Sequence, residues 1–236
     1  MNQQAGVAIL AHLEAVAAER AQRTADPSLG ERVVAIKHYQ QRRFEHSYAD
    51  LLAHPRYAGA SNFFLEELYG PSDFTQRDSQ FARIVPALVR MFPSEVVATV
   101  ESLGALHALS ERFDTTMARA LPQAVVDAES YARAWQLCGD PAGRERQIAL
   151  LQHVGESLDS LTRNPLLRHS LRLMRGPARA AGMAALQAFL EAGFDTFRAM
   201  RGAGEFLELV GRRERELAHA LFSCHPGDAF RLGQLP

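Results

Sequence analysis

The chain has 236 residues, of which 47% are hydrophobic and 22% charged, and its formal net charge is −1. This composition is typical of a protein that buries a sizeable core, and it excludes an intrinsically disordered chain. Because there is no basic excess to neutralise a phosphate backbone, the charge balance argues against nucleic-acid binding.

Helical periodicity extends over nearly the whole chain, and no segment has the alternating pattern of a strand. The fourth predicted helix begins at Asp73, which has capping-box spacing with Gln76, and Pro86 is expected to kink it. The predicted helices lie, in chain order, at residues 3–23, 28–53, 57–69, 73–92, 93–121, 123–138, 141–163, 165–175, 178–200 and 203–223.

The breaks between these helices are short, and no linker rich in glycine or serine divides the chain. The sequence therefore predicts an all-α fold, a single-domain bundle of about nine or ten helices over residues 1–236. Residues 225–236 are expected to form an irregular tail.

A distinctive string, FFLEELY, lies at residues 63–69 and is followed by Gly70-Pro71. On a helical wheel Phe64 falls on the apolar face, whereas Glu66 points away from it. The string resembles the bacterial FFLEELY-motif proteins, which are named after it. The resemblance implies an all-helical intracellular protein and implies no reaction.

The location of the protein follows from three features. The N-terminus lacks a basic segment, and His12 and Glu14 interrupt its apolar run, so we expect no signal peptide. No apolar stretch is long enough to cross a bilayer. Cys138 and Cys224 are typical of buried thiols in a reducing compartment, although the sequence leaves a disulfide between them open. We therefore expect a soluble cytoplasmic protein that does not bind membranes.

The fourth predicted helix carries charged residues within its apolar stripe. Arg77 and Asp78 fall inside the width of that stripe, and an ionic group in a core requires a partner. Glu67 and two arginines of the second predicted helix are the expected partners. Either a buried salt-bridge network or a ligand site would fit this pattern. The candidate polar site comprises Arg42, Arg43, Tyr48, Glu67, Asp73, Arg77, Asp78 and His107.

Lys37 is the only lysine among 26 basic residues, and it lies on the apolar face of the second predicted helix. A desolvated lysine can act as a base or nucleophile because burial lowers its pKa. Alternatively, its stem lies on apolar surface while the ammonium group reaches water.

His107 lies on the apolar side of the fifth predicted helix, with Glu111 and Asp114 nearby. These groups could ligate iron, manganese or zinc, and His107 could be the axial ligand of a haem. A solvated edge beside a hydrogen-bonded histidine explains the same pattern. A di-iron site needs two Glu-x-x-His pairs, whereas the chain has one, Glu216 and His219, which is expected to face water. We therefore predict no metal centre, and the sequence identifies no cofactor.

Two functions remain open from the sequence. The favoured one is a non-enzymatic binding or regulatory module, whose partner is another protein or a small polar ligand. The alternative is an enzyme or cofactor-binding protein in which the charged groups orient a substrate and His107 or Tyr48 transfers protons. Mutually satisfied groups without a cavity would indicate a structural network, whereas an open pocket would favour the enzyme.

Overall fold

The computed structural model describes residues 2–67 and 74–236, and for Glu67 the backbone alone. Every regular element in these ranges is a helix, so the predicted all-α fold is confirmed for them. The elements are α1 (Asn2–Ala25), α2 (Pro27–Ser47), α3 (Ala49–Ala53), α4 (Ala58–Glu67), α5 (Thr75–Met91), α6 (Ser94–Ala120), α7 (Ala128–Cys138), α8 (Pro141–Thr162), α9 (Pro165–Leu173), α10 (Arg175–Ala180), α11 (Ala184–Met200), α12 (Gly204–Ser223) and the 3₁₀-helix η1 (Pro226–Arg231).

The predicted number of nine or ten helices is slightly too low, since twelve α-helices lie in the described ranges. The second predicted helix is interrupted at Tyr48, whose backbone leaves the helical region at φ −121° and ψ 23°. The segment predicted as two helices over 165–200 forms three, and Gly182 adopts a positive φ of 73° in the turn between the last two. The expected irregular tail contains η1. The predicted capping residue Asp73 lies outside the described residues.

Three helices begin with the same local device, an Asp or Asn at the N-cap followed by proline. Asp26, Asp140 and Asn164 each accept a hydrogen bond from a backbone N–H of the first turn, and a proline follows each of them. The side-chain oxygen satisfies an orphan donor, and the proline ring fixes φ at a helical value where no N–H is needed. The chain thus sets these helix starts by local chemistry.

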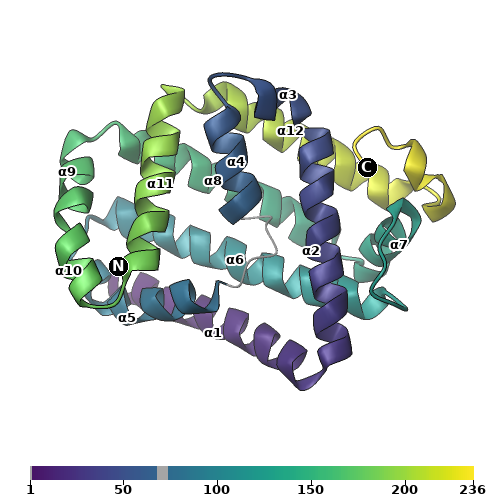
Figure 1. The fold of residues 1–236 in the computed structure, drawn as a ribbon, viewed down its shortest axis with the longest axis horizontal. Coiled ribbons are helices and arrows are strands. Elements are labelled where there is room, and N and C mark those ends of the chain that lie inside the picture. The colour runs from purple at the N-terminus through teal and green to yellow at the C-terminus, as the bar shows by residue number, and fades with distance from the viewer. Residues whose placement is uncertain (1, 68–73) are drawn as a thin grey trace.

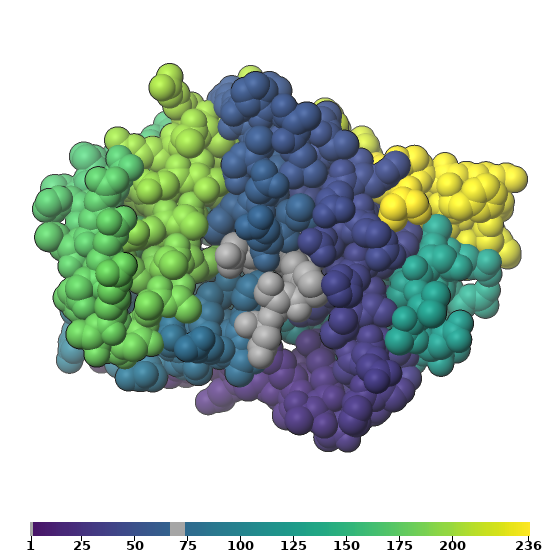
Figure 2. Space-filling view, in the orientation of Figure 1, coloured from purple at the N-terminus to yellow at the C-terminus, as the bar shows by residue number. Residues whose placement is uncertain are grey.

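The longest helix, α6, runs through the centre of the bundle (Figure 1) and packs against α1, α2, α7 and α8. Helix α12 lies against α7 and α8, and α11 lies against α4 and α8. On the face shown in Figure 2, α2 and α4 cover the middle, α9 and α11 form one end, and α7 lies with the C-terminal residues at the other. None of the described helices is both long and apolar enough to span a membrane.

The buried apolar side chains fall into three clusters. The first joins α2, α6, α7 and α12 around Tyr39 and Tyr131. The second joins α2, α3, α4, α6, α8, α11 and α12 around Phe64. The third joins α1, α5 and α6 around Ile9. Since α6 contributes to all three, it is the element that holds the clusters together.

The wheel prediction for the FFLEELY string is confirmed where its side chains are described. Phe64 is 3% exposed, and its ring lies 5.6 Å from that of Phe206 and 6.2 Å from that of Phe197. Glu66, by contrast, is exposed. The first half of the string is therefore part of the second apolar cluster.

We predict that Phe64→Ala lowers the free energy of unfolding by about 3–5 kcal/mol, because it leaves a cavity among aromatic rings. The matched control is Glu66→Ala two residues away, which should change that free energy by less than about 0.5 kcal/mol. Urea unfolding of both variants measures the difference. Equal unfolding midpoints for the two variants would show that the aromatic cluster contributes little.

Candidate functional site

A cavity of about 160 Å³ lies where the three apolar clusters approach one another. Its lining includes Tyr131 from the first cluster, Leu151 from the second and Leu13 from the third. An engineered cavity of about 150 Å³ holds a benzene molecule, so this one is large enough for a small organic ligand. The central helix α6 and helix α8 supply much of its wall.

Helices α6 and α8 run in opposite directions, and on both of them polar residues line one end of the cavity and apolar residues line the other. Arg144, in the first turn of α8, bonds to Met117 near the end of α6, and Gln147 donates to Ser110 at 2.8 Å. The apolar residues of the wall are Leu13, Phe74, Phe81, Val100, Leu103, Leu106, Ile148, Leu151, Leu186, Phe189 and Leu190, and the ionic ones are Lys37, Arg43, Arg77, Asp78, Glu111, Asp114, Arg144 and Glu214.

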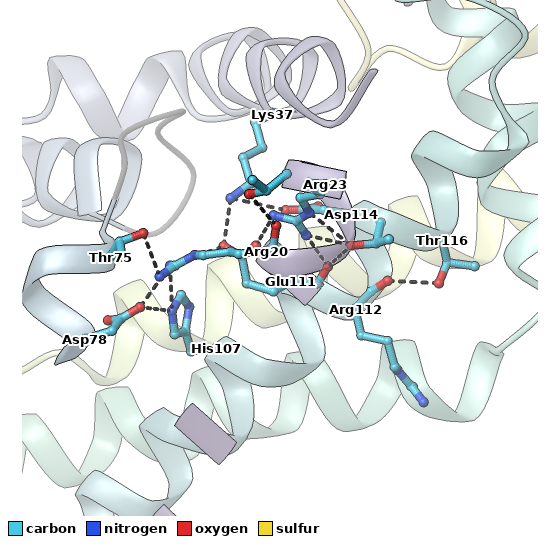
Figure 3. Close-up of polar contacts among 12 residues, drawn as sticks. Arg20, Arg23, Lys37, Thr75, Asp78, His107, Glu111, Arg112, Asp114 and Thr116 are labelled. Carbon is cyan, nitrogen blue, oxygen red and sulfur yellow. Dashed lines mark hydrogen bonds and ion pairs between the residues drawn. The ribbon is translucent and has the colours of Figure 1, made fainter. Parts of the chain in front are cut away.

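Glu111 of α6 is the centre of an ionic network at the polar end (Figure 3). Its side chain is 4% exposed, and Lys37 Nζ lies 2.7 Å from its Oε1. Arg23 forms an ion pair with the other oxygen, and its Nη2 donates to the Glu111 carbonyl at 2.7 Å. The ammonium group of Lys37 therefore binds a buried carboxylate, and the Lys37 side chain is 15% exposed.

The pKa values of the two buried carboxyl groups of α6, Glu111 and Asp114, are shifted in opposite directions. Burial opposes ionisation of Glu111, but Lys37 and Arg23 outweigh it and lower its pKa from 4.5 to about 2. Burial raises the pKa of Asp114 above its ordinary value, although Lys37 counteracts the effect. Asp114 accepts a hydrogen bond from Gln40 at 3.0 Å and lies 3.8 Å from Lys37.

Asp78 of α5 binds a cation and a histidine at the side of the cavity (Figure 3). Its Oδ2 lies 2.8 Å from Arg20 Nη2 and 2.9 Å from His107 Nε2. Burial would raise the pKa of Asp78, but the hydrogen bond with His107 and the charges of His107, Arg20 and Arg77 hold it below its ordinary value. As predicted, Arg77 and Asp78 are mostly buried, with side chains 14% and 15% exposed.

Asp78 was expected to pair with an arginine of the second predicted helix, but the described residues show a different partner, Arg20. Arg20 comes from α1, and it pairs with Asp78 across 58 positions of sequence. The guanidinium of Arg77 lies 3.9 Å from the ring centre of Phe74 and 4.3 Å from that of Phe189. The other expected partner, the Glu67 side chain, lies outside the described residues.

Arg43 and Tyr48 of the predicted site meet at Glu214 of α12. Arg43 Nη1 lies 2.6 Å from Glu214 Oε1, and the Tyr48 hydroxyl donates to the same oxygen at 2.6 Å. Arg43 is 3% exposed and Tyr48 is fully buried. This pair ties the C-terminal half of α2 to α12, and both Arg43 and Glu214 line the cavity.

Arg144 is a buried cation that the sequence analysis missed. It is 4% exposed, and its guanidinium carbon lies 3.8 Å from the ring centre of Phe113 and 3.7 Å from that of Trp135. Its Nη1 donates to Gln147 Oε1 at 3.1 Å, and its Nη2 donates to the Met117 sulfur at 3.1 Å. Its Nε is buried without an acceptor. Burial lowers the pKa of Arg144 below its ordinary value.

The structure brings four of the predicted residues to the cavity wall, namely Arg43, Arg77, Asp78 and His107. Arg42 is exposed above the ring of Tyr39, 5.5 Å from its centre, and does not line the cavity. Arg20, Arg23, Glu214 and Arg144 were not predicted. A signal for Arg144 was available, since Arg144, Ile148 and Leu151 share a helical face that is otherwise apolar.

Among the described side chains, those of residues 2–66 and 74–236, no group of three or more His, Cys, Asp and Glu is placed to hold a metal ion. The alternative that Glu111 and Asp114 form a solvated edge is wrong, because they are 3% and 7% exposed. Glu216 and His219 are exposed, as predicted. Cys138 and Cys224, for which a disulfide was left open, are free thiols.

Residues 19–228 match the family model of a domain of unknown function, DUF8198. The matched range contains every residue of the network described above. No curated protein and no solved structure matches the chain.

We predict that Glu111→Gln lowers the free energy of unfolding by about 3–5 kcal/mol at pH 7, because Lys37 and Arg23 lose their buried counter-charge. The matched control is Glu129→Gln, which removes an exposed ion pair with Arg133 on α7 and should cost less than about 1 kcal/mol. Urea unfolding measures both. A small loss for Glu111→Gln would mean that the network does not stabilise the fold.

The stabilisation by Glu111 should also depend on pH. Because its folded-state pKa is lowered to about 2 from 4.5, the contribution is fully present above pH 4.5 and is lost as the pH falls towards 2. The difference in unfolding free energy between the parent protein and Glu111→Gln should therefore shrink between pH 5 and pH 3. A difference that stays constant over this range would contradict the lowered pKa.

Proposed function

The chain belongs to the DUF8198 family, and we propose that it is a non-enzymatic binding protein that holds a small molecule in the cavity between α6 and α8. The observation that carries the proposal is the lining of this cavity, apolar at one end and ionic at the other. Ligand sites typically combine an apolar wall with a few placed polar groups that fix orientation. A purely structural network would need no such space.

The ionic groups support a ligand site in a second way. Nearly all of them are held by partners from other helices, as Glu111 is by Lys37 and Arg23. Side chains fixed in this way form a pre-organised wall, and a ligand that binds to it loses little free energy in ordering the protein. The network and the cavity are therefore compatible parts of one site.

An enzyme is the second candidate, and the opposed pKa shifts of Glu111 and Asp114 favour it. Carboxyl groups whose pKa values are pushed apart are typical of general acid–base sites. His107, oriented by Asp78 at 2.9 Å, resembles a base with its positioning carboxylate. We place the enzyme second because these groups already bind one another, so chemistry would require that a substrate displace those contacts.

We further propose that the protein acts in the cytoplasm and is related to the bacterial FFLEELY-motif proteins. The free thiols Cys138 and Cys224 support a reducing compartment. The string at residues 63–69 supports the relation. The near-neutral charge supports a small molecule or another protein as partner in place of nucleic acid.

The binding proposal predicts that small organic compounds perturb the NMR signals of cavity residues in the full-length protein. Leu103→Trp, which fills the cavity with a larger side chain, should abolish these shifts. The matched control is Leu137→Trp, placed where the leucine is 66% exposed, and it should leave them unchanged. Shifts that survive in Leu103→Trp, or a compound library without a single cavity binder, would contradict the proposal. Chemical turnover of a bound compound would favour the enzyme.

A further inference from the structure

Arg144 is the cation of the cavity wall whose charge the described residues leave unbalanced. Each of the other cationic side chains in that wall has a carboxylate within 4.0 Å, in the pairs Lys37–Glu111, Arg43–Glu214 and Arg77–Asp78. Arg144 has no carboxylate at that distance among the described side chains, those of residues 2–66 and 74–236. Only 4% of Arg144 is exposed. A charge buried to this extent is unfavourable without a counter-ion.

The acidic groups near Arg144 do not supply this counter-ion. Burial raises the pKa of the Cys138 thiol and of the Tyr131 phenol, so both are neutral at pH 7. Asp114 accepts a hydrogen bond from Gln40 and faces Lys37, and its own pKa is raised by burial.

We propose that the polar end of the cavity receives the carboxylate of a small monocarboxylic acid, with Arg144 as its counter-ion and the apolar wall around its body. This inference rests on the proposed binding function and names its ligand class. The N–H groups of arginine only donate, so the missing partner is an acceptor. Arg144 itself carries a single positive charge, which a monoanion balances. A dianion such as a phosphate ester would add charge beside Glu111 and Glu214.

The position of the guanidinium supports a planar anion. The ring centres of Phe113 and Trp135 lie 3.8 Å and 3.7 Å from the guanidinium carbon. Two rings this close must occupy opposite faces of the group, which leaves its plane as the approach for an anion. Approach in that plane is the geometry of paired hydrogen bonds between arginine and a carboxylate. Arg144 is itself one of the residues that line this cavity.

The apolar end sets the size of the rest of the ligand. Ile148 and Leu151 continue the helical face of Arg144, and Leu186 and Leu190 of α11 also line the space. From the benzene-sized reference cavity, about 160 Å³ accommodates a molecule of about six to ten non-hydrogen atoms. Benzoate and 3-methylbutanoate meet these requirements and serve as probes.

The experiment compares each acid with its neutral alcohol by calorimetric titration of the full-length protein. Benzoate should bind more tightly than benzyl alcohol, and 3-methylbutanoate more tightly than 3-methylbutan-1-ol, by about tenfold or more, as expected for hydrogen bonds to a charged group. Arg144→Gln should remove this preference while the alcohols keep their affinity. The matched control, Arg146→Gln, changes an exposed arginine of the same helix and should preserve the preference.

The outcomes separate this inference from the function on which it rests. If the alcohols bind as tightly as the acids, the proposal that Arg144 binds a carboxylate is wrong, while the proposed binding function stands. If phenyl phosphate binds more tightly than benzoate, the proposal that the ligand is a monoanion is wrong. Absence of binding by both acids and alcohols, together with a negative NMR screen, would overturn both proposals. The comparison of acid with alcohol on the parent protein decides the question even if Arg144→Gln does not fold.

Discussion

The arrangement of the bundle depends on one buried carboxylate, that of Glu111 at the middle of α6. A carboxylate removed from water is unfavourable unless cations and donors surround it, and here Lys37 arrives from α2 and Arg23 from α1. Three helices must therefore hold one relative position for the charge to be tolerated. An apolar contact at the same place would allow small sliding movements, whereas this contact fixes the register of α1 and α2 on α6.

The ionic network also explains why the interior is not one continuous apolar core. Three apolar clusters pack around α6, and the charged groups occupy the space between them. Close packing favours interdigitated apolar side chains, but ion pairs are held at fixed distances and directions and fill space less completely. The cavity lies along this boundary, with its apolar wall supplied by the clusters and its ionic wall by the network.

Local patterns in the sequence were sufficient for most of the fold and for part of the site. Periodicity predicted the helices because it reflects one face of one element, and the same rule placed Phe64 inward and Asp78 among apolar residues. It could not name Arg20 as the partner of Asp78, since that contact depends on how α1 packs on α5 and α6. Arg144 lies on an apolar helical face that the sequence shows, but its burial against Phe113 and Trp135 depends on how α6 and α7 pack around the start of α8.

The stacking of Arg144 on Trp135 has a practical consequence. Trp135 is the single tryptophan of the chain, and it lies 3.7 Å from the guanidinium carbon in the wall of the cavity. Indole emission responds to charge and polarity beside the ring, and no other indole adds a background signal. The protein thus carries an intrinsic fluorophore at the polar end of its cavity, so occupancy of that end can be followed by light without a label.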